Sequence, residues 1–277
     1  MKVIETINEM RQARKELAEP VGFVATMGAL HAGHVSLIRQ AREENASVAV
    51  SIFVNPAQFG PSEDFASYPR DPKGDLALLE MEKVDVVFMP PVEEMYPPGF
   101  NTWVEVEGVS EQLEGTFRPG HFRGVATVVN KLFDIIEPAR SYFGQKDAQQ
   151  SIVIKKMVAD LALNLEIVVM PTVREMDGLA VSSRNAYLHP KERRAATVLY
   201  RALSLAEQLW GRGEKEAGMI KEEMTKLILR EPLAAIDYIS IVHPQTLEEM
   251  EDVKPPALIL LAVKIGRTRL IDNVFVG

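Results

Sequence analysis

The apolar residues in the first half of the chain fall into short continuous runs, separated by segments with helical signals. One run begins at Val21, and residues 47–54 and 84–89 form two more. Continuous apolar runs of this length predict strands that are buried on both faces. The segments between them predict helices, one opening near Gly33 and one ending at Met81. This β-α-β-α-β order predicts an α/β fold built on a doubly wound parallel sheet.

Further elements follow the same two patterns as far as Met170. Helices are expected where apolar residues keep a spacing of three or four, and strands where they run together. We expect the strand that ends at Met170 to be buried. The predicted helices cover residues 6–17, 122–136 and 152–161, and the predicted strands cover residues 103–106, 140–143 and 165–170.

The chain changes character after a turn that spans residues 173–178. Two charged helices, over residues 189–210 and 214–229, precede two apolar strands, over residues 236–242 and 257–263. Helices followed by strands in this way indicate an α+β arrangement. We therefore expect a Rossmann-like domain over residues 1–176 and a smaller α+β domain over residues 177–277.

The composition limits the classes of function. Of the 277 residues, 47% are hydrophobic and 25% are charged, which is typical of a soluble globular protein. The net charge of −8 and the lack of a dense Lys/Arg stripe argue against a nucleic-acid partner. The chain has no cysteine, which excludes disulfides and a cysteine nucleophile and fits a cytoplasmic location. No signal peptide or membrane-spanning segment is expected.

Two histidines lie at the first predicted strand-to-helix turn. His31 and His34 are three residues apart, so both imidazoles are expected around the first turn of the helix, beside its unpaired N–H groups. Such a helix start attracts phosphate, and Gly28 and Gly33 would let a polyphosphate approach closely. Taken alone, the pair is more simply a tight βα turn with incidental histidines. Its position, where open parallel sheets bind ligands, favours a binding site.

Three further polar clusters lie at predicted strand ends or turns. Each has an ordinary alternative when it is taken alone: Lys146 is then a solvated lysine, and the serine-rich turn is then a domain linker. A lysine is nevertheless a good point-charge partner for phosphate, and an arginine offers a planar fork of donors. The clusters are Asn55 with Gln58, Lys146 with Asp147 and Gln150, and Ser182 with Ser183 and Arg184.

The stretch T-M-G-A-L-H-A-G-H resembles the HIGH-type signature of nucleotidyltransferases, which attack the α-phosphate of ATP. Over nearly the whole chain, the motifs resemble those of the pantothenate synthetase family. Two departures stand out: Ala25 replaces a usual proline, and Val181 replaces a usual methionine. The motifs that carry the resemblance are T-M-G-A-L-H-A-G-H, S-I-F-V-N-P-A-Q-F, Y-P-R, E-G-T-F-R-P-G-H-F-R-G-V-A-T-V-V, F-G-Q-K-D-A-Q-Q and V-R-E-M-D-G-L-A-V-S-S-R-N-A-Y-L.

The resemblance implies that ATP, pantoate and β-alanine are converted to pantothenate, AMP and pyrophosphate through a pantoyl adenylate. It also implies that Mg²⁺ enters with ATP and not at a protein metal site, and that the chain forms a homodimer. The implied catalytic residues are His34, His31, Lys146 and Arg184. The implied substrate contacts are Gln58 and Gln150 for pantoate, Gln58 and Asn55 for β-alanine, and, for ATP, Met27, Gly28, Ala29, Leu30, His31, Ala32, Gly33, His34, Gly144, Gln145, Lys146, Asp147, Val173, Val181, Ser182, Ser183 and Arg184.

Three alternatives stay open at this point. Another HIGH-type adenylyltransferase acting on a phosphorylated cofactor precursor would need a basic acceptor pocket, whereas the loops here offer Asn55, Gln58 and Gln150. A class I aminoacyl-tRNA synthetase would need a basic RNA-binding extension. A regulatory nucleotide-binding module would not need phosphate-directed groups from three separate loops.

Overall fold

The structure is a computed structural model that describes residues 1–61 and 63–277. It divides into two compact units. The first unit comprises Met1–Gly144 and Gln149–Pro171, and the second comprises Gln145–Ala148 and Thr172–Gly277. The chain therefore passes into the second unit shortly before the boundary expected after residue 176. The reason is local pairing, because Val181 N already donates a hydrogen bond to the Val173 carbonyl within the second unit.

A parallel sheet forms the centre of the first unit and confirms the predicted doubly wound α/β fold. Its strand order is β1-β4-β3-β2-β5-β6, and each neighbouring pair is parallel. The order reverses between β2 and β5, so the carboxyl ends of these two strands mark the point where open parallel sheets bind ligands. The strands are β1 (Lys2–Ile4), β2 (Val21–Thr26), β3 (Ser47–Ile52), β4 (Val86–Phe88), β5 (Arg140–Gly144) and β6 (Glu166–Met170).

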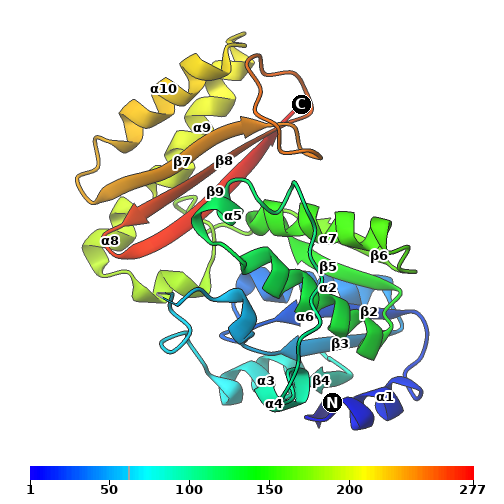
Figure 1. Ribbon diagram of the computed structural model, residues 1–277. Coiled ribbons are helices and arrows are strands. Elements are labelled where there is room, and N and C mark those ends of the chain that lie inside the picture. The colour runs from blue at the N-terminus through cyan, green and yellow to red at the C-terminus, as the bar shows by residue number, and fades with distance from the viewer. Residues whose placement is uncertain (62) are drawn as a thin grey trace. The chain divides into compact units, whose positions relative to one another are not determined.

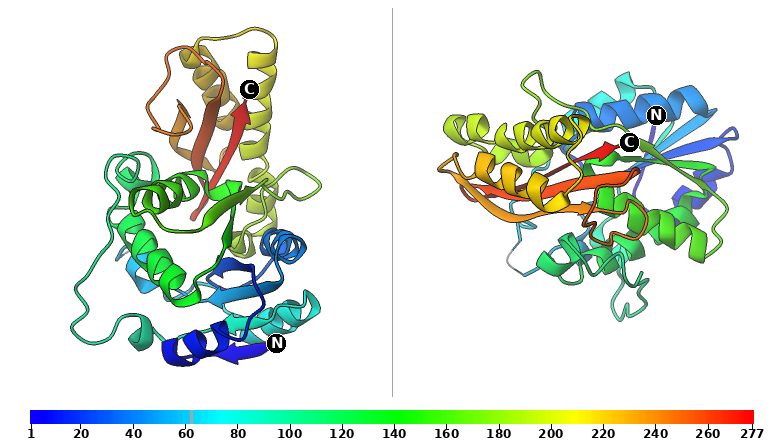
Figure 2. Two further views of the ribbon diagram at one scale, coloured as in Figure 1. Left: turned by 90° about the vertical axis from the view of Figure 1, so that its right-hand side faces the viewer. Right: turned by 90° about the horizontal axis from the view of Figure 1, so that it is seen from above.

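Helices cover both faces of this sheet (Figures 1 and 2). Successive strand residues point to opposite faces. Accordingly, Val24 packs in a cluster with Ile38 of one helix, while Phe23 contacts Phe133 of another edge-to-face, with ring centroids 6.4 Å apart. The helices are α1 (Ile7–Arg14), α2 (Ala32–Glu44), α3 (Pro72–Met81), α6 (His121–Ile136) and α7 (Ala148–Asp160), with short α4 (Val92–Met95) and α5 (Glu114–Phe117) and the 3₁₀ turn η1 (Pro56–Gln58). The 3₁₀ turn η2 (Gln145–Asp147) belongs to the second unit.

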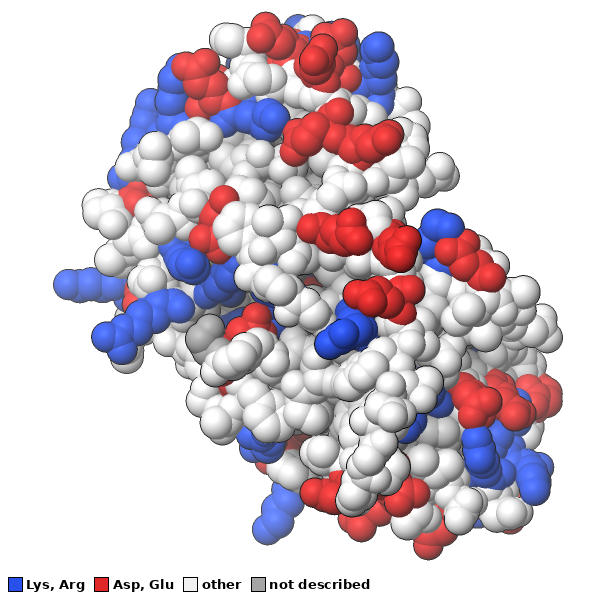
Figure 3. All heavy atoms as spheres, in the orientation of Figure 1, with Lys and Arg blue, Asp and Glu red and all other residues white. Residues whose placement is uncertain are grey.

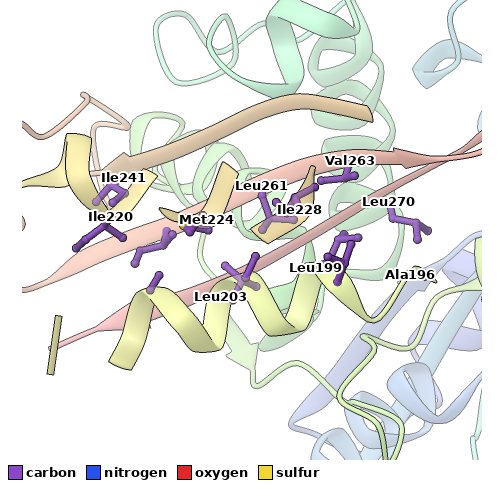
Figure 4. Close-up of a cluster of buried hydrophobic side chains, with 14 of the residues drawn as sticks. Ala196, Leu199, Leu203, Ile220, Met224, Ile228, Ile241, Leu261, Val263 and Leu270 are labelled. Carbon is purple, nitrogen blue, oxygen red and sulfur yellow. The ribbon is translucent and has the colours of Figure 1, made fainter. Parts of the chain in front are cut away.

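The second unit is an antiparallel sheet with helices packed on it, as the α+β prediction requires. Its strands β7 (Ala234–Val242), β8 (Ala257–Ile265) and β9 (Thr268–Val276) pair in that order. Figure 4 shows side chains of α9 (Val198–Gly211) and α10 (Ala217–Ile228) meeting Leu261 and Val263 of β8 in one buried cluster. Two shorter elements, η3 (Ser183–Tyr187) and α8 (Pro190–Ala195), precede these helices.

Several predicted elements differ from the structure. Residues 103–106 form no strand, and Trp103 instead stacks on Tyr96. The strand β6 is half-buried, because it lies at the sheet edge. The helix expected over residues 189–210 is interrupted at Ala196 and Thr197. The expected helix ending at Leu161 stops one residue earlier, and Leu161 is 50% exposed.

Candidate active site

The two histidines of the first βα turn cap the helix that follows it. His31 is the N-cap of α2, and its Nδ1 accepts a hydrogen bond from Gly33 N at 3.2 Å. His34 Nδ1 accepts one from His31 N at 3.3 Å, so the two residues form a reciprocal capping box. The rings stack with centroids 4.0 Å apart. Because each Nδ1 accepts a backbone N–H, the proton of each neutral ring lies on Nε2.

The turn before the cap has an unusual backbone. Gly28 and Ala29 both have positive φ, of 81° and 49°, a conformation that costs energy for alanine. The carboxylate of Asp75, on α3, holds this backbone by accepting Ala29 N at 2.9 Å and Leu30 N at 2.7 Å. Burial raises the pKa of Asp75, while the two N–H groups lower it. Sequence reasoning missed Asp75, because an acidic residue in a first helical turn is also ordinary helix chemistry.

Loop residues after β2 and β3 are brought together, as expected from their position at one sheet edge. Gln58 Nε2 donates to the thioether sulfur of Met27 at 3.2 Å. Asn55 Nδ2 donates to Gln58 Oε1 at 3.0 Å, so both ends of the Gln58 amide are held. The buried Gln58 side chain therefore has a defined orientation beside the turn that carries the histidines.

Asn55 is 1% exposed, and its amide is engaged within the protein. Its Nδ2 also donates to the Gly124 carbonyl at 3.1 Å, and its Oδ1 accepts Ala57 N at 3.3 Å and the Tyr96 hydroxyl at 2.8 Å. Burial raises the pKa of Tyr96, so its hydroxyl stays a donor. Asn55 thus uses its hydrogen-bonding capacity to hold the Gln58 turn.

Gln149 and Gln150 are neighbours on the first turn of α7 but differ in environment. Gln149 is buried, and its amide accepts Glu114 N at 3.0 Å and donates to the carbonyls of Val109 and Gln112 at 2.9 and 2.8 Å. Gln150 is half-buried. The environments give Gln149 a structural role in holding the 109–114 loop, whereas Gln150 stays partly exposed.

In the second unit, the turn that carries Lys146 is held by the last strand. Asn273 Nδ2 donates to the carbonyls of Gln145 and Lys146 at 2.8 and 2.9 Å. The Lys146 ammonium lies 3.4 Å from the Asp147 carboxylate. Asn273 is 2% exposed and was missed from the sequence, because nothing in a single chain indicates that β9 contacts this turn.

The serine-rich segment follows a short hairpin in the same unit. Residues Val173 and Val181 pair through their backbones, and Ser182 caps η3 by accepting Arg184 N at 3.3 Å. The base of the hairpin is anchored by Arg174, which donates to both oxygens of the buried Asp272 at 2.6 and 2.9 Å. Val173, Val181, Ser182, Ser183 and Arg184 are all half-buried.

The distribution of charge agrees with the composition. Figure 3 shows Lys/Arg and Asp/Glu side chains interspersed over the face in view. Within the described ranges 1–61 and 63–277, no cluster of three or more His, Asp or Glu side chains could hold a metal ion. No helix in this part of the chain is long and apolar enough to cross a membrane.

A parallel sheet whose switch point carries a helix-capping H-x-x-H turn defines an α/β protein of Rossmann-like fold. A model of the pantoate-beta-alanine ligase family matches residues 2–275, and the chain belongs to that family. The pantothenate synthetase of Herpetosiphon aurantiacus is 57% identical over 275 residues, covering 99% of both chains. That of Thermotoga petrophila is 54% identical over 280 residues, covering 100% of both chains.

Solved structures agree with this assignment. The pantothenate synthetase of Thermus thermophilus superposes with a TM-score of 0.95 at 48% identity, with 99% of both chains covered. The pantoate-beta-alanine ligase of Francisella tularensis, complexed with beta-gamma ATP and beta-alanine, gives 0.82 at 36% identity, with 99% and 97% covered. The chain is therefore an ATP-dependent ligase that joins pantoate to β-alanine. An adenylyltransferase acting on a cofactor precursor is not favoured.

Proposed function

We propose that ligation runs through a pantoyl adenylate, formed at the turn that carries His31 and His34. The observation that supports this most directly is the capping box, which leaves each imidazole with its proton on Nε2 at the N-terminus of α2. A fixed N–H donor at a positive helix end suits the charge that develops on the α-phosphate and the departing pyrophosphate. His34 is the principal donor, and His31 assists from the same turn.

Three segments of the chain contact ATP in this proposal. Residues 27–34 and Gly144 of the first unit contact the nucleotide, and Asp75 keeps the backbone of residues 29 and 30 in place. In the second unit, Gln145, Lys146 and Asp147 contact the ribose and phosphates. Val173 and residues 181–184 cover the triphosphate. Lys146 and Arg184 supply the positive charge, Lys146 as a point charge and Arg184 as a planar fork.

Gln58 and Gln150 hold pantoate, because an amide both donates and accepts and so matches hydroxyl and carboxylate groups together. In the first half-reaction, a pantoate carboxylate oxygen bonds to the α-phosphorus and pyrophosphate leaves. In the second, the β-alanine amine bonds to the activated carbonyl carbon, loses a proton, and AMP leaves with the bridging oxygen. Gln58 also faces β-alanine. Asn55, buried and fully engaged, serves that step by fixing Gln58.

Mg²⁺ enters as the counterion of ATP. Mg²⁺ binds such substrates mainly through phosphate oxygens and keeps several of its waters. We further propose that the enzyme works in the cytoplasm as a homodimer formed through the first unit. Sedimentation equilibrium tests the dimer, and fractionation of cells that express the tagged chain tests the location.

One experiment tests the adenylate. Wild-type enzyme, ATP and pantoate without β-alanine should release about one pyrophosphate per site in a rapid burst, since a shielded mixed anhydride survives until an amine arrives. Addition of β-alanine should then release AMP and pantothenate. With carboxylate oxygen-18 in pantoate, one labelled oxygen should appear in AMP. Unlabelled AMP, or pyrophosphate release that requires β-alanine, would contradict the acyl-adenylate route.

A further inference from the structure

We propose that Arg118 and His121 are positioning residues that fix the peptide carbonyl of Gln58 and thereby set the enzyme's affinity for pantoate. Both residues belong to the R-P-G-H-F-R-G segment. None of the substrate contacts proposed above lies in this segment. The inference rests on the proposed contact between Gln58 and pantoate.

The hydrogen-bond pattern fixes the tautomer of His121. Its Nδ1 lies 2.8 Å from the Gln58 carbonyl oxygen, which can only accept, so Nδ1 carries the proton. Its Nε2 lies 3.1 Å from Arg118 Nη1, which can only donate, so Nε2 accepts. The imidazole is therefore neutral and has a partner at each nitrogen. A protonated ring would turn a donor toward the guanidinium and lose that contact.

Arg118 is fixed in turn by Glu63. Its Nε and Nη2 each lie 2.7 Å from one oxygen of the Glu63 carboxylate, a two-point contact that sets the plane of the guanidinium. The side chains of Arg118 and Glu63 are only 14% and 22% exposed, so water weakens this pair less than it does a surface pair. Arg118 Nη2 also approaches the Gln58 carbonyl at 3.4 Å.

The helix that begins at His121 is packed tightly against the same turn. A Cβ atom on Gly124, one helical turn further, would lie 2.2 Å from the Ala57 carbonyl oxygen, so only glycine allows this approach. The Gly124 carbonyl accepts the Asn55 amide at 3.1 Å. Residues 118, 121 and 124 therefore contact the 55–58 turn from one side.

These contacts converge on the residue whose amide is already directed by Met27 and Asn55. A peptide unit and its side chain share the same Cα, so a shift of the Gln58 carbonyl moves the amide as well. A displacement of about 1 Å at a residue that positions a substrate is costly for catalysis. The effect should concern pantoate, because within residues 1–61 and 63–277 Arg118 and His121 are linked to the proposed ATP contacts through Gln58 and Met27.

The test compares two replacements of His121 that each preserve one nitrogen. His121→Asn places an amide near Nδ1 and keeps a donor for the Gln58 carbonyl, whereas His121→Gln places it near Nε2 and loses that donor. We expect His121→Gln to raise the KM for pantoate by about tenfold, with the KM for ATP unchanged. His121→Asn should stay within about threefold of wild type, because the bond to Gln58 survives. If His121→Gln does not fold, Arg118→Lys replaces it, since lysine lacks the fork.

A double-mutant cycle separates positioning from general stabilisation. In a Gln58→Ala background, His121→Gln should change the pantoate KM by less than about twofold, because the group it positions is gone. His243→Gln, the same replacement in the second unit, serves as the matched control and should change neither KM. Equal effects of His121→Gln on both substrates, equal effects of the Asn and Gln variants, or full additivity with Gln58→Ala would each overturn the proposal. The burst of pyrophosphate from the wild-type enzyme with ATP and pantoate tests the proposed function independently of these variants.

Discussion

At the scale of single residues, the two nitrogens of His34 have different tasks, which a substitution can separate. Asparagine keeps an acceptor near Nδ1 for His31 N but has no donor where Nε2 lies, whereas glutamine does the opposite. We expect His34→Asn to fold normally and to slow pyrophosphate release by about 10²–10³, the usual cost of losing one preorganised donor. Single-turnover kinetics with ATP and pantoate measure this. A His34→Asn enzyme faster than His34→Gln would contradict the assignment of Nε2.

Asp75 is tested by an isosteric change. In Asp75→Asn, one carboxylate oxygen becomes an NH₂ group that faces a backbone N–H, so one buried donor loses its acceptor. The expected loss of unfolding free energy is about 1–3 kcal/mol, with a higher KM for ATP because the strained 28–29 backbone relaxes. Asp71→Asn on the same helix is the control, since asparagine caps as well as aspartate. Equal losses of unfolding free energy in the two variants, measured by urea unfolding, would contradict the role of Asp75 in holding the backbone of residues 29 and 30.

His121 gives a pH dependence with a defined sign. Burial, reinforced by the Arg118 charge, lowers the pKa of His121 from 6.5 to about 4, although the hydrogen bond to the Gln58 carbonyl and the charges of Glu63 and Glu114 oppose this. Between these values the unfolded chain binds a proton that the native state does not, so native stability falls as the pH falls. The stability difference between wild type and His121→Asn should shrink by about 1 kcal/mol from about pH 6 to about pH 5. A constant difference in urea unfolding would contradict a neutral His121.

The sequence predicted the residues that lie at strand ends, but not those that hold them. His31, His34, Asn55 and Gln58 follow apolar strands directly, so the parallel-sheet rule placed them at one edge. Asp75 and His121 act on backbone groups that are distant in sequence. No spacing rule connects a side chain to a carbonyl or N–H on another element, so such partners appear only when the chain is folded.

At the scale of elements, the strand β9 was missed although it carries a contact to Lys146. Arg269, Asp272 and Asn273 interrupt its apolar pattern, so no strand was expected after residue 263. The polar residues have buried partners: Asp272 pairs with Arg174, and Asn273 holds the carbonyls of Gln145 and Lys146. A polar residue interrupts the apolar pattern that predicts a strand. The same polarity lets it form hydrogen bonds or ion pairs with distant partners.

The role of Asn273 can be tested by replacing its amide NH₂ donor with an acceptor. Asn273→Asp replaces the NH₂ group with an oxygen that repels the carbonyls of Gln145 and Lys146, so the turn shifts. We expect pyrophosphate release to slow by about tenfold or more, while conversion of supplied pantoyl adenylate with β-alanine continues. In a Lys146→Ala background the same change should have little further effect. Additive losses in this cycle would mean that Asn273 supports the unit in general and not Lys146.

At the scale of the whole molecule, the pattern of apolar runs was sufficient for the class of each unit, although β9 was missed and residues 103–106 form no strand. The second unit begins at Thr172 and also includes residues 145–148, although the chain on either side of those four residues belongs to the first unit. A sequence is read in order, and a short segment that contacts strands far along the chain cannot be assigned from local composition. Compact units are defined by contacts, and contacts follow from the fold.

The assignment of Arg184 and Gln58 to different substrates makes the last prediction. Arg184 lies in the second unit and is proposed to contact ATP alone, while Gln58 lies in the first unit and is proposed to contact pantoate. Arg184→Ala should therefore raise the KM for ATP and leave that for pantoate unchanged, and Gln58→Ala should do the reverse. Because the two groups are proposed to contact different substrates, their effects on kcat/KM in the double variant should add within about 0.5 kcal/mol. Steady-state kinetics with each substrate varied in turn measure this. A loss of pantoate affinity in Arg184→Ala would show that the 182–184 segment serves the acid and not the nucleotide.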